Sequence, residues 1–163
     1  MQGPWLANGA NNFLLSYLNK DSYVLEFGMG LSTIWFANNV KKIVSIEHNK
    51  NWFSKISYAL SKCDNVELIL HETNVVPGTD LIEDCYSVEI EKFPDEFFDL
   101  VLVDGRNRVN CFKKADRVLK TGGYMMLDNS ERGCYSELFS FYRGKERFDA
   151  IQNPMWKTSW WRK

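Results

Sequence analysis

Two patterns of hydrophobic and polar residues follow one another along this chain: short apolar runs, and stretches in which apolar residues recur at helical spacing. The pattern changes every ten to twenty residues. Five short, mostly apolar runs occur, four of which end at glycine or at an acidic residue, which is typical of strands buried on both faces. Between these runs, apolar residues recur every three or four positions, the spacing of one face of a helix. Trp52, Phe53 and Ile56, for example, share one side of a helix predicted over about 50–61. The pattern therefore predicts strands that alternate with helices from residue 23 onward.

The predicted strands are 23–27, 43–46, 66–70, 98–103 and 123–127, with two late strands near 147–152 and 157–162. The predicted helices are 12–19, 31–39, about 50–61, 109–119 and about 133–142. The acidic stretch 72–97 contains Pro77, Gly78 and Pro94 and is predicted to be a loop that carries a short helix. Strands alternating with helices form a mostly parallel sheet with helices on both faces, an α/β fold built as a three-layer αβα sandwich.

Length and composition limit the organisation of the chain. Its 163 residues are 45% hydrophobic, which is enough for one core, so we expect a single domain over 1–163. In this domain, 1–22 is an N-terminal helical segment and 72–97 is a variable acidic loop. The net charge of −1 gives no electrostatic basis for binding nucleic acid. No signal peptide, no membrane span and no cysteine cluster is evident, so we expect a cytoplasmic protein with reduced thiols and no membrane or nucleic-acid partner.

Candidate chemistry begins where the first strand ends, at 26–33 (EFGMGLST). In open α/β sheets the ligand binds beyond the carboxyl ends of the strands. Gly28 and Gly30 allow a sharp turn and a close approach to a ligand, and the helix that follows directs N–H groups toward an anion. Glu26 suits a ligand with an ammonium next to a carboxylate, as in S-adenosylmethionine. Thr33 stands where the GxGxxG fingerprint of NAD-binding proteins requires a third glycine.

Acidic and basic side chains follow the next two strands. Glu47 ends the second strand, 17 residues after Gly30, where an acid can accept hydrogen bonds from both ribose hydroxyls of a nucleoside. His48 and Trp52 lie close by and can flank an adenine, although a solvated histidine and a core tryptophan are the alternatives. His71 follows the third strand, where it is a general base, a histidine beside the adenine, or an exposed histidine.

Oxygen-bearing side chains follow the fourth and fifth strands. Asp104 ends one strand and Asp128 and Asn129 end the other, so a sheet in which these strands are adjacent brings all three to one rim. Two carboxylates and an amide oxygen are suitable ligands for Mg²⁺. The alternative is that Asp104 faces cofactor or substrate and Asp128 caps a loop.

Three arginines lie in the same loops. Arg106, Arg108 and Arg132 follow the fourth and fifth strands, on the predicted rim. The planar guanidinium suits a carboxylate or phosphate, so these residues favour an anionic or sugar-like acceptor, whereas the alternative is that they are simply solvated.

With these motifs, the chain resembles the class I S-adenosylmethionine-dependent methyltransferases from about Tyr23 to its C-terminus. The resemblance rests on VLEFGMG, SIEH, FDLVLVDG, GGYMMLDN and the closing TSWWRK. It implies the Rossmann-like methyltransferase fold, a seven-stranded sheet whose last strand is antiparallel, and S-adenosylmethionine as the cofactor. The cofactor-binding residues expected on this basis are Glu26, Phe27, Gly28, Gly30, Ser32, Thr33, Glu47, His48 and Asp104.

The trio of Asp104, Asp128 and Asn129 is similar to that of the small O-methyltransferases of the catechol type, in which a divalent metal orients and acidifies the acceptor hydroxyl. That group has a lysine base shortly after the strand-four aspartate, whereas Gly105 and Arg106 follow here. Without a metal, Asp104 or His71 would have to accept the proton, or the acceptor is already nucleophilic. We therefore expect O-methylation of a small acceptor, with or without Mg²⁺.

Two other functions stay open: an NAD-type oxidoreductase that uses the same turn, and a non-catalytic module that binds S-adenosylmethionine. Little of the chain is left for choosing an acceptor. Either a small-molecule acceptor is held on an open rim, or the second subunit of a homodimer completes the pocket.

Overall fold

A computed structural model describes residues 3–153 and 155–163 of the chain. Its strands are β1 (Tyr23–Phe27), β2 (Lys42–Glu47), β3 (Val66–Leu70), β4 (Phe98–Val103), β5 (Leu119–Leu127), β6 (Arg147–Ile151) and β7 (Lys157–Arg162). Its α-helices are α1 (Asn8–Tyr17), α2 (Leu31–Asn39), α3 (Lys50–Ala59), α4 (Arg108–Ala115) and α5 (Ser136–Phe141). Two 3₁₀ helices, η1 (Tyr86–Lys92) and η2 (Gly133–Tyr135), complete the set.

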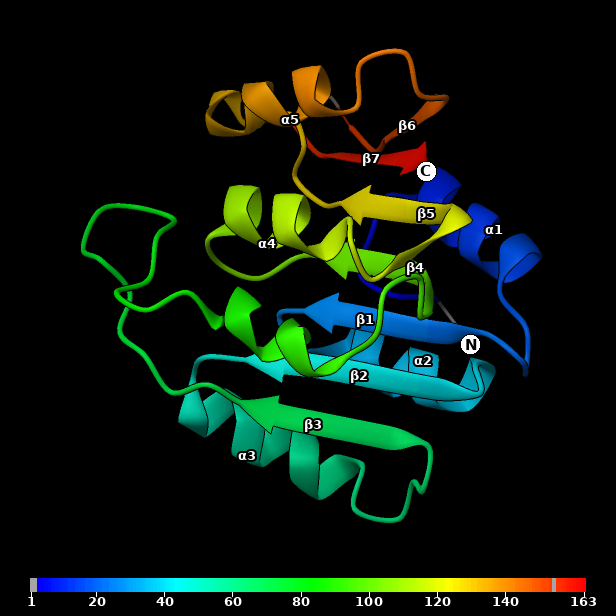
Figure 1. Cartoon of the computed structure of the whole chain (residues 1–163). Helices are drawn as coiled ribbons and strands as arrows, with labels where there is room; N and C mark the ends of the chain where they lie inside the picture. Colours follow the sequence, from blue (N-terminus) through cyan, green and yellow to red (C-terminus); the bar gives the residue numbers. More distant parts are fainter. Residues whose placement is uncertain (1–2, 154) are drawn as a thin grey trace.

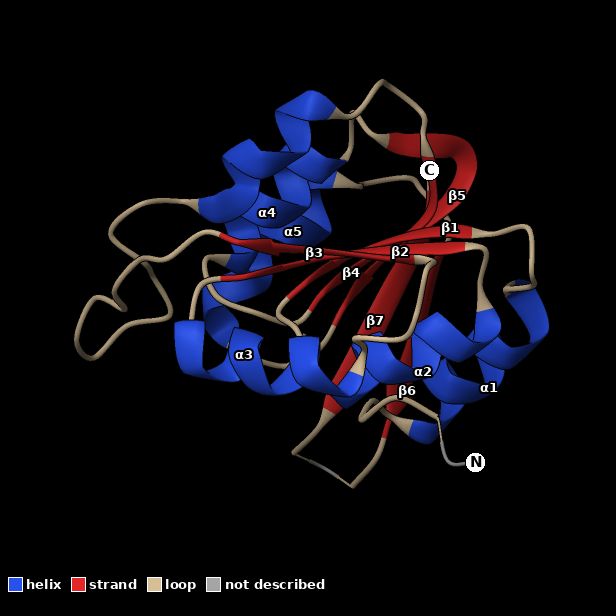
Figure 2. Cartoon of the chain, turned by 90° about the horizontal axis from the view of Figure 1, so that it is seen from below, coloured by secondary structure: helices blue, strands red, loops and turns tan. Residues whose placement is uncertain are grey.

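The strands form one seven-stranded sheet in the order β3-β2-β1-β4-β5-β7-β6 (Figure 1). β1 to β5 are parallel, and β7 lies antiparallel between β5 and β6. Helices α4 and α5 cover one face, and α1, α2 and α3 cover the other (Figure 2). The predicted three-layer α/β fold with an antiparallel last strand is therefore confirmed.

Alternate residues of the central strands feed two separate cores. Leu25 and Phe27 of β1 pack in the core that α4 covers, whereas Val24 belongs to the core beneath α1 and α2. In β7, Trp161 enters the first core and Trp160 the second. Continuous apolar runs are needed in strands that are buried on both faces, which is why these strands were recognisable in the sequence. Among the described residues, none of the helices is long and apolar enough to cross a membrane.

The largest error in the predicted elements lies before the fifth strand. The helix predicted over 109–119 ends at Ala115, and β5 already begins at Leu119, which pairs with Phe98. Gly122 and Gly123, interpreted as the entry to the strand, lie inside it, where the register with β4 shifts. A side chain on Gly123 would lie 2.7 Å from the carbonyl oxygen of Asp99, so the glycines allow an irregular strand to continue. The first helix also begins earlier than predicted, at Asn8.

Candidate active site

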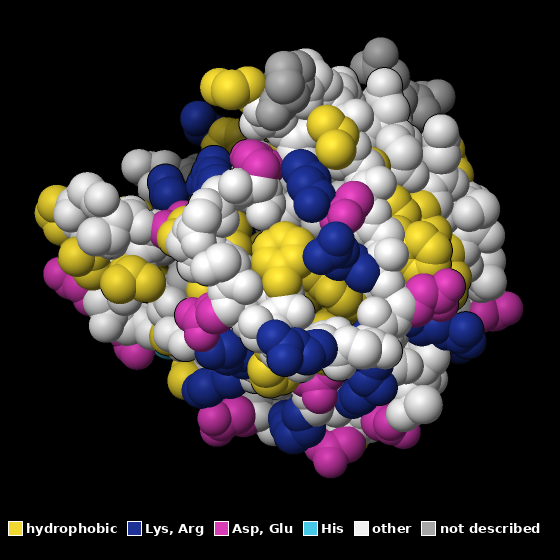
Figure 3. Space-filling model, turned by 90° about the horizontal axis from the view of Figure 1, so that it is seen from above, with side chains coloured by type: hydrophobic (Ala, Val, Ile, Leu, Met, Phe, Trp, Pro, Cys, Tyr) yellow, Lys and Arg dark blue, Asp and Glu magenta, His cyan; other side chains and the backbone are white. Residues whose placement is uncertain are grey.

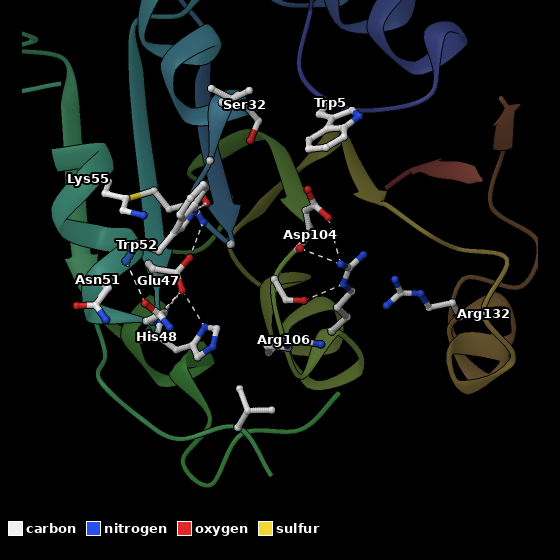
Figure 4. Close-up of a pocket in the computed structure, with 18 residues that line it drawn as sticks. Trp5, Ser32, Glu47, His48, Asn51, Trp52, Lys55, Asp104, Arg106 and Arg132 are labelled. Carbon is white, nitrogen blue, oxygen red and sulfur yellow. Dashed lines mark hydrogen bonds and ion pairs between the residues drawn. The ribbon is translucent and has the colours of Figure 1, made fainter. Parts of the chain in front are cut away.

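A cavity of about 730 Å³ opens at the carboxyl ends of the parallel strands (Figure 4). It lies where the strand order reverses, between β1–β2 on one side and β4 on the other. Ligands of open α/β sheets bind at this switch point, and the volume is typical of small-molecule sites. Residues from the N-terminal segment, from the segments after each of β1 to β5 and from helix α3 line it.

The two glycines of the turn after β1 are required for different reasons. Gly28 has φ 96°, and a Cβ there would lie 2.5 Å from the backbone of Gly105. Gly28 therefore permits the close contact between the ends of β1 and β4. Gly30 has an extended backbone open to any residue, and a Cβ there would meet only Ser32 Oγ, at 3.7 Å. Because Gly30 lines the cavity, its missing side chain leaves room for a ligand.

Glu26 does not reach the cavity, which corrects the prediction that it contacts the ligand. It is wholly buried, and its carboxylate accepts hydrogen bonds from the hydroxyls of Ser32, Thr33 and Ser45, the last at 2.6 Å. Burial raises the pKa of Glu26 to about 7, although the three hydroxyl groups oppose the shift. Glu26 therefore positions the start of α2 from beneath.

Two other predicted cofactor residues also act from below the cavity. Thr33 is fully buried and accepts a hydrogen bond from the Gly30 N–H at 2.8 Å, which caps α2. Phe27 packs edge-on against Tyr86 in the core. Ser32 does line the cavity, while its hydroxyl donates to Glu26. The turn is thus fixed by buried partners and presents mainly backbone to the cavity.

Glu47 and His48, at the end of β2, line the cavity as predicted. The Glu47 carboxylate accepts the N–H groups of Met29 at 3.0 Å, His48 at 2.9 Å and Asn49 at 2.8 Å. Burial would raise the pKa of Glu47, but His48 and these amides hold it below its usual range. The Nδ1 of His48 lies 2.8 Å from a Glu47 carboxylate oxygen. The acid at the predicted ribose position is therefore ionised and oriented.

Trp52 lines the cavity and is 42% exposed, so it is not a core residue. Its indole N–H donates to the carbonyl of Met29, within the turn after β1, and Lys55 lies 5.8 Å from its ring. This places an aromatic face at the edge of the cavity beside Glu47 (Figure 4).

On the other side of the cavity, Asp104 is bound to the buried Arg108. Arg108 Nη2 lies 3.1 Å from an Asp104 carboxylate oxygen, and the same guanidinium donates to the carbonyls of Asp104, Gly105 and Asp128. Only 6% of the Arg108 side chain is exposed, compared with 29% of Asp104. Arg108 was predicted to be a substrate ligand at the surface. It does line the cavity, but it is buried, and its guanidinium joins the ends of β4 and β5.

Burial raises the pKa of Asp104; Arg108 opposes this shift, and the carboxyl of Asp128 adds to it. Asp104 is therefore a better proton acceptor near neutral pH than an ordinary aspartate. Burial raises the pKa of Asp128 as well.

The predicted metal trio does not form a cation site. Asp128 does not line the cavity; it accepts hydrogen bonds from Thr158 Oγ1 at 2.6 Å and Trp156 Nε1 at 3.1 Å. Asn129 adopts a left-handed conformation in the turn after β5 and also lies outside the cavity lining. The guanidinium of Arg108 already supplies a positive charge between Asp104 and the end of β5. Residues 3–153 and 155–163 contain no metal-binding cluster of histidine, cysteine and acidic side chains. This arrangement does not fit Mg²⁺, because the Asp128 carboxylate is bound by Thr158 and Trp156 outside the cavity lining and Asp104 is paired with the cation of Arg108.

Arg106 and Arg132 both line the cavity, as predicted. Arg106 pairs with Asp80 of the acidic loop, at 3.1 Å. Asp80 also accepts the hydroxyl of Tyr135 at 2.7 Å, so the acidic loop is attached to the loops after β4 and β5. No carboxylate of the described chain lies within ion-pair distance of Arg132.

His71 does not line the cavity, so the structure does not bring this predicted base together with Asp104. Its Nδ1 lies 2.7 Å from Glu89 and its Nε2 lies 3.2 Å from Asp84, both in the acidic loop. Burial would lower the pKa of His71, but these two acids raise it above its usual value. Through these two contacts His71 holds the acidic loop against the end of β3.

Sequence patterns missed several residues that line the cavity. Asn51 and Lys55 are one helical turn apart on α3, so they follow from the position of Glu47 once the helix is recognised. Trp5 precedes α1, and nothing local signals its position.

A second, shallower hollow of about 390 Å³ lies beside α5 and the loop before β6. It is lined by Phe139, Tyr142, Arg143, Lys145, Arg147 and Trp161. The face seen in Figure 3 shows lysine and arginine side chains gathered around hydrophobic ones. This hollow lies away from the carboxyl ends of the parallel strands and from every candidate residue discussed above.

No family model and no curated protein sequence matches this chain. Solved structures do resemble it. The precorrin 8w decarboxylase of Methanobacterium thermoautotrophicum is 15% identical, with a TM-score of 0.69, and the match covers 100% of this chain and 96% of that one. An rRNA methylase from Streptococcus thermophilus is 17% identical, with a TM-score of 0.66, over 95% and 94% of the two chains. The protein SMU.1697c from Streptococcus mutans, solved in complex with SAH (S-adenosylhomocysteine), is 15% identical, with a TM-score of 0.65, over 92% and 93%. At these identities the likeness shows a shared fold.

Proposed function

We propose that this protein is an S-adenosylmethionine-dependent methyltransferase that methylates a hydroxyl group of a small anionic or sugar-like acceptor without a bound metal. The observation that carries the proposal is the cavity at the switch point, with Gly30 and Glu47 on one wall and Asp104 on the other. Similar solved structures include an rRNA methylase and a protein in complex with SAH, which supports the same cofactor class.

The residues after β1 and β2 fit this cofactor. Gly30 leaves space where a side chain would stand, and the first turn of α2 faces the cavity through Leu31 and Ser32. Glu47, held ionised by backbone amides, is placed to accept the ribose hydroxyls. Trp52 offers an aromatic face to the adenine. S-adenosylmethionine supplies an activated methyl group on a sulfonium and carries its own leaving group.

The residues after β4 fit the role of receiving a proton. Asp104 is partly exposed to the cavity, and its raised pKa makes it basic enough to accept the proton of an acceptor hydroxyl near pH 7. Arg108 holds that carboxylate in place through its 3.1 Å contact. Holding the acceptor and excluding water are the remaining contributions of the protein, and Trp5 and Trp52 at the two ends of the cavity suit both.

Two alternatives agree less well with these observations. An NAD-type oxidoreductase would need a glycine in place of the buried Thr33, whose hydroxyl caps α2. A non-catalytic binding module has no use for an oriented carboxylate with a raised pKa in the wall of the cavity.

Isothermal titration calorimetry tests the cofactor. We expect SAH to bind and NADH not to bind. We expect Glu47→Gln to weaken the binding of SAH by about 10-fold or more, since a bidentate acceptor is lost. Glu67→Gln is the matched control, because Glu67 lies on β3 and pairs only with surface lysines. Binding of NADH without SAH would overturn the proposal.

Methyl transfer from labelled S-adenosylmethionine to a panel of hydroxyl acceptors tests the reaction. We expect Asp104→Asn to lower kcat by about 100-fold while SAH affinity is unchanged. Activity that survives this substitution would remove Asp104 from the mechanism.

A further inference from the structure

The cavity has two ends of different character, and only one of them fits the cofactor. The end beside β1 and β2 is formed by the glycine turn, Glu47 and Trp52. The other end is formed by Trp5, by Asp104 with its neighbouring arginines, and by Arg132 from the loop after β5 (Figure 4). If the proposed function is correct, this second end receives the acceptor, and its side chains describe what the acceptor must be.

Of the three arginines at this end, two have their charges neutralised within the protein. Arg108 contacts Asp104 and three carbonyls, and Arg106 pairs with Asp80. Arg132 is different. It is exposed, and among the described residues no carboxylate lies within ion-pair distance of its guanidinium.

The hydroxyl of Tyr135 and the acids Asp80 and Glu131 favour the charged form of Arg132, but both acids have closer partners. Asp80 binds Arg106 and the hydroxyl of Tyr135, and Glu131 accepts the backbone N–H of Lys157 at 2.9 Å. Arg132 thus presents a positive charge to the cavity that a ligand anion can neutralise.

Trp5 is the aromatic surface of this end. It is 76% exposed although it is large and apolar, and its ring lies beside the cavity above Asp104 (Figure 4). The segment around it is nevertheless fixed: the Asn11 amide donates to the carbonyls of Pro4 at 2.9 Å and Leu6 at 3.3 Å. The ring also packs edge-on against Trp156, 6.5 Å away between centroids. An exposed but anchored indole is a surface on which a flat ligand can stack.

From these observations we infer that the acceptor is a planar ring compound that carries an anionic group, and that Trp5 and Arg132 select it. The ring stacks on Trp5, the carboxylate or phosphate pairs with Arg132, and the hydroxyl to be methylated faces Asp104, which lies between them (Figure 4). Trp5 and Arg132 are binding residues. Neither takes part in the proton transfer.

Calorimetry in the presence of saturating SAH tests this inference with small probes. The probes are 3-hydroxy-2-naphthoate, its neutral amide, 2-naphthyl phosphate and the non-planar anion trans-4-hydroxycyclohexanecarboxylate. We expect the naphthoate to bind at least about 10-fold more tightly than the amide, because a charge-assisted pair is gained. We expect it to bind about 5-fold more tightly than the cyclohexane acid, because stacking is gained. The phosphate compared with the naphthoate shows which anion Arg132 prefers.

Variants assign the two preferences to residues. Arg132→Gln is expected to remove the difference between naphthoate and amide, while Arg143→Gln, in the remote second hollow, leaves it unchanged. Trp5→Leu is expected to weaken binding of all three naphthalene probes and not of the cyclohexane acid, and Trp5→Phe to restore most of the loss. SAH affinity stays the same in all of these variants.

The inference is overturned if no planar anion binds at about 1 mM, or if Arg132→Gln changes naphthoate affinity by less than about 2-fold. Failure of the wild-type protein to bind SAH would instead overturn the proposed function. The two failures are therefore distinguishable in the same titrations.

Discussion

Replacing each glycine of the turn after β1 by alanine separates folding from ligand binding. In Gly28→Ala the new Cβ would lie 2.5 Å from both the Cα and the N of Gly105, at φ 96°. Backbone must move to relieve this contact. Left-handed strain of about 1–2 kcal/mol and overpacking of about 1–3 kcal/mol give a loss of roughly 2–5 kcal/mol in the free energy of unfolding. For a chain of this length that is a fall in Tm of roughly 5–15 °C.

In Gly30→Ala the backbone is extended and the nearest atom is Ser32 Oγ at 3.7 Å, an ordinary contact. The free energy of unfolding should change by less than about 0.5 kcal/mol, as for unstrained surface positions. The added methyl group occupies cavity space, so SAH affinity should fall by about 10-fold or more.

Thermal unfolding followed by circular dichroism and calorimetry with SAH measure the two effects in both variants. The reasoning is refuted if Gly28→Ala unfolds within about 2 °C of the wild type, or if Gly30→Ala is the less stable variant. Unchanged SAH affinity in a folded Gly30→Ala variant would refute the assignment of this turn to the cofactor.

Three further outcomes follow from the buried charges. Burial raises the pKa of Glu26 to about 7 in the folded protein, above its unfolded value, so stability should fall as pH rises from about 4.5 to about 7. In urea unfolding at a series of pH values, Glu26→Gln should remove up to ~3 kcal/mol of this pH-dependent change in the free energy of unfolding. A variant whose stability falls as steeply with pH as that of the wild type would contradict the assignment. Arg108→Met should lower the free energy of unfolding by about 3–5 kcal/mol in the same assay, because it leaves Asp104 without its cation. Arg108→Lys should not restore this stability, since a lysine cannot bind several carbonyls in one plane. A loss below about 1 kcal/mol would argue against this role. EDTA should leave the rate of methyl transfer unchanged, and loss of activity restored by Mg²⁺ would reinstate the metal site.

The strands were predictable because mostly apolar runs such as Phe98–Val103 are required wherever a strand is covered on both faces. The residues at their carboxyl ends were predictable as a group for a related reason: parallel strands end at one edge, which brings Glu47, Asp104 and Arg132 to one cavity. The same reasoning could not assign partners within that group.

Partner choice depends on contacts between distant segments. Arg108 reaches Asp104 because the bends at 105–107 turn the chain back before α4 begins, and no sequence pattern describes that course. Asp128 is removed from the cavity by Thr158, which reaches it because β7 lies next to β5. His71 is paired by acids of the loop at 72–97, whose course no periodic pattern describes.

The position of β7 between β5 and β6 has a consequence for a nascent chain. The outer edge of β5 stays unpaired until the β6–β7 hairpin has left the ribosome, and an open strand edge is prone to wrong pairing. The segment that carries Trp5 is attached to the same hairpin, through the Ala7 N–H on Thr158 and through α1 on β6. The wall of the cavity beside β1 and β2 can therefore assemble early in synthesis, whereas the wall beside Trp5 must wait for strands encoded about 150 residues later.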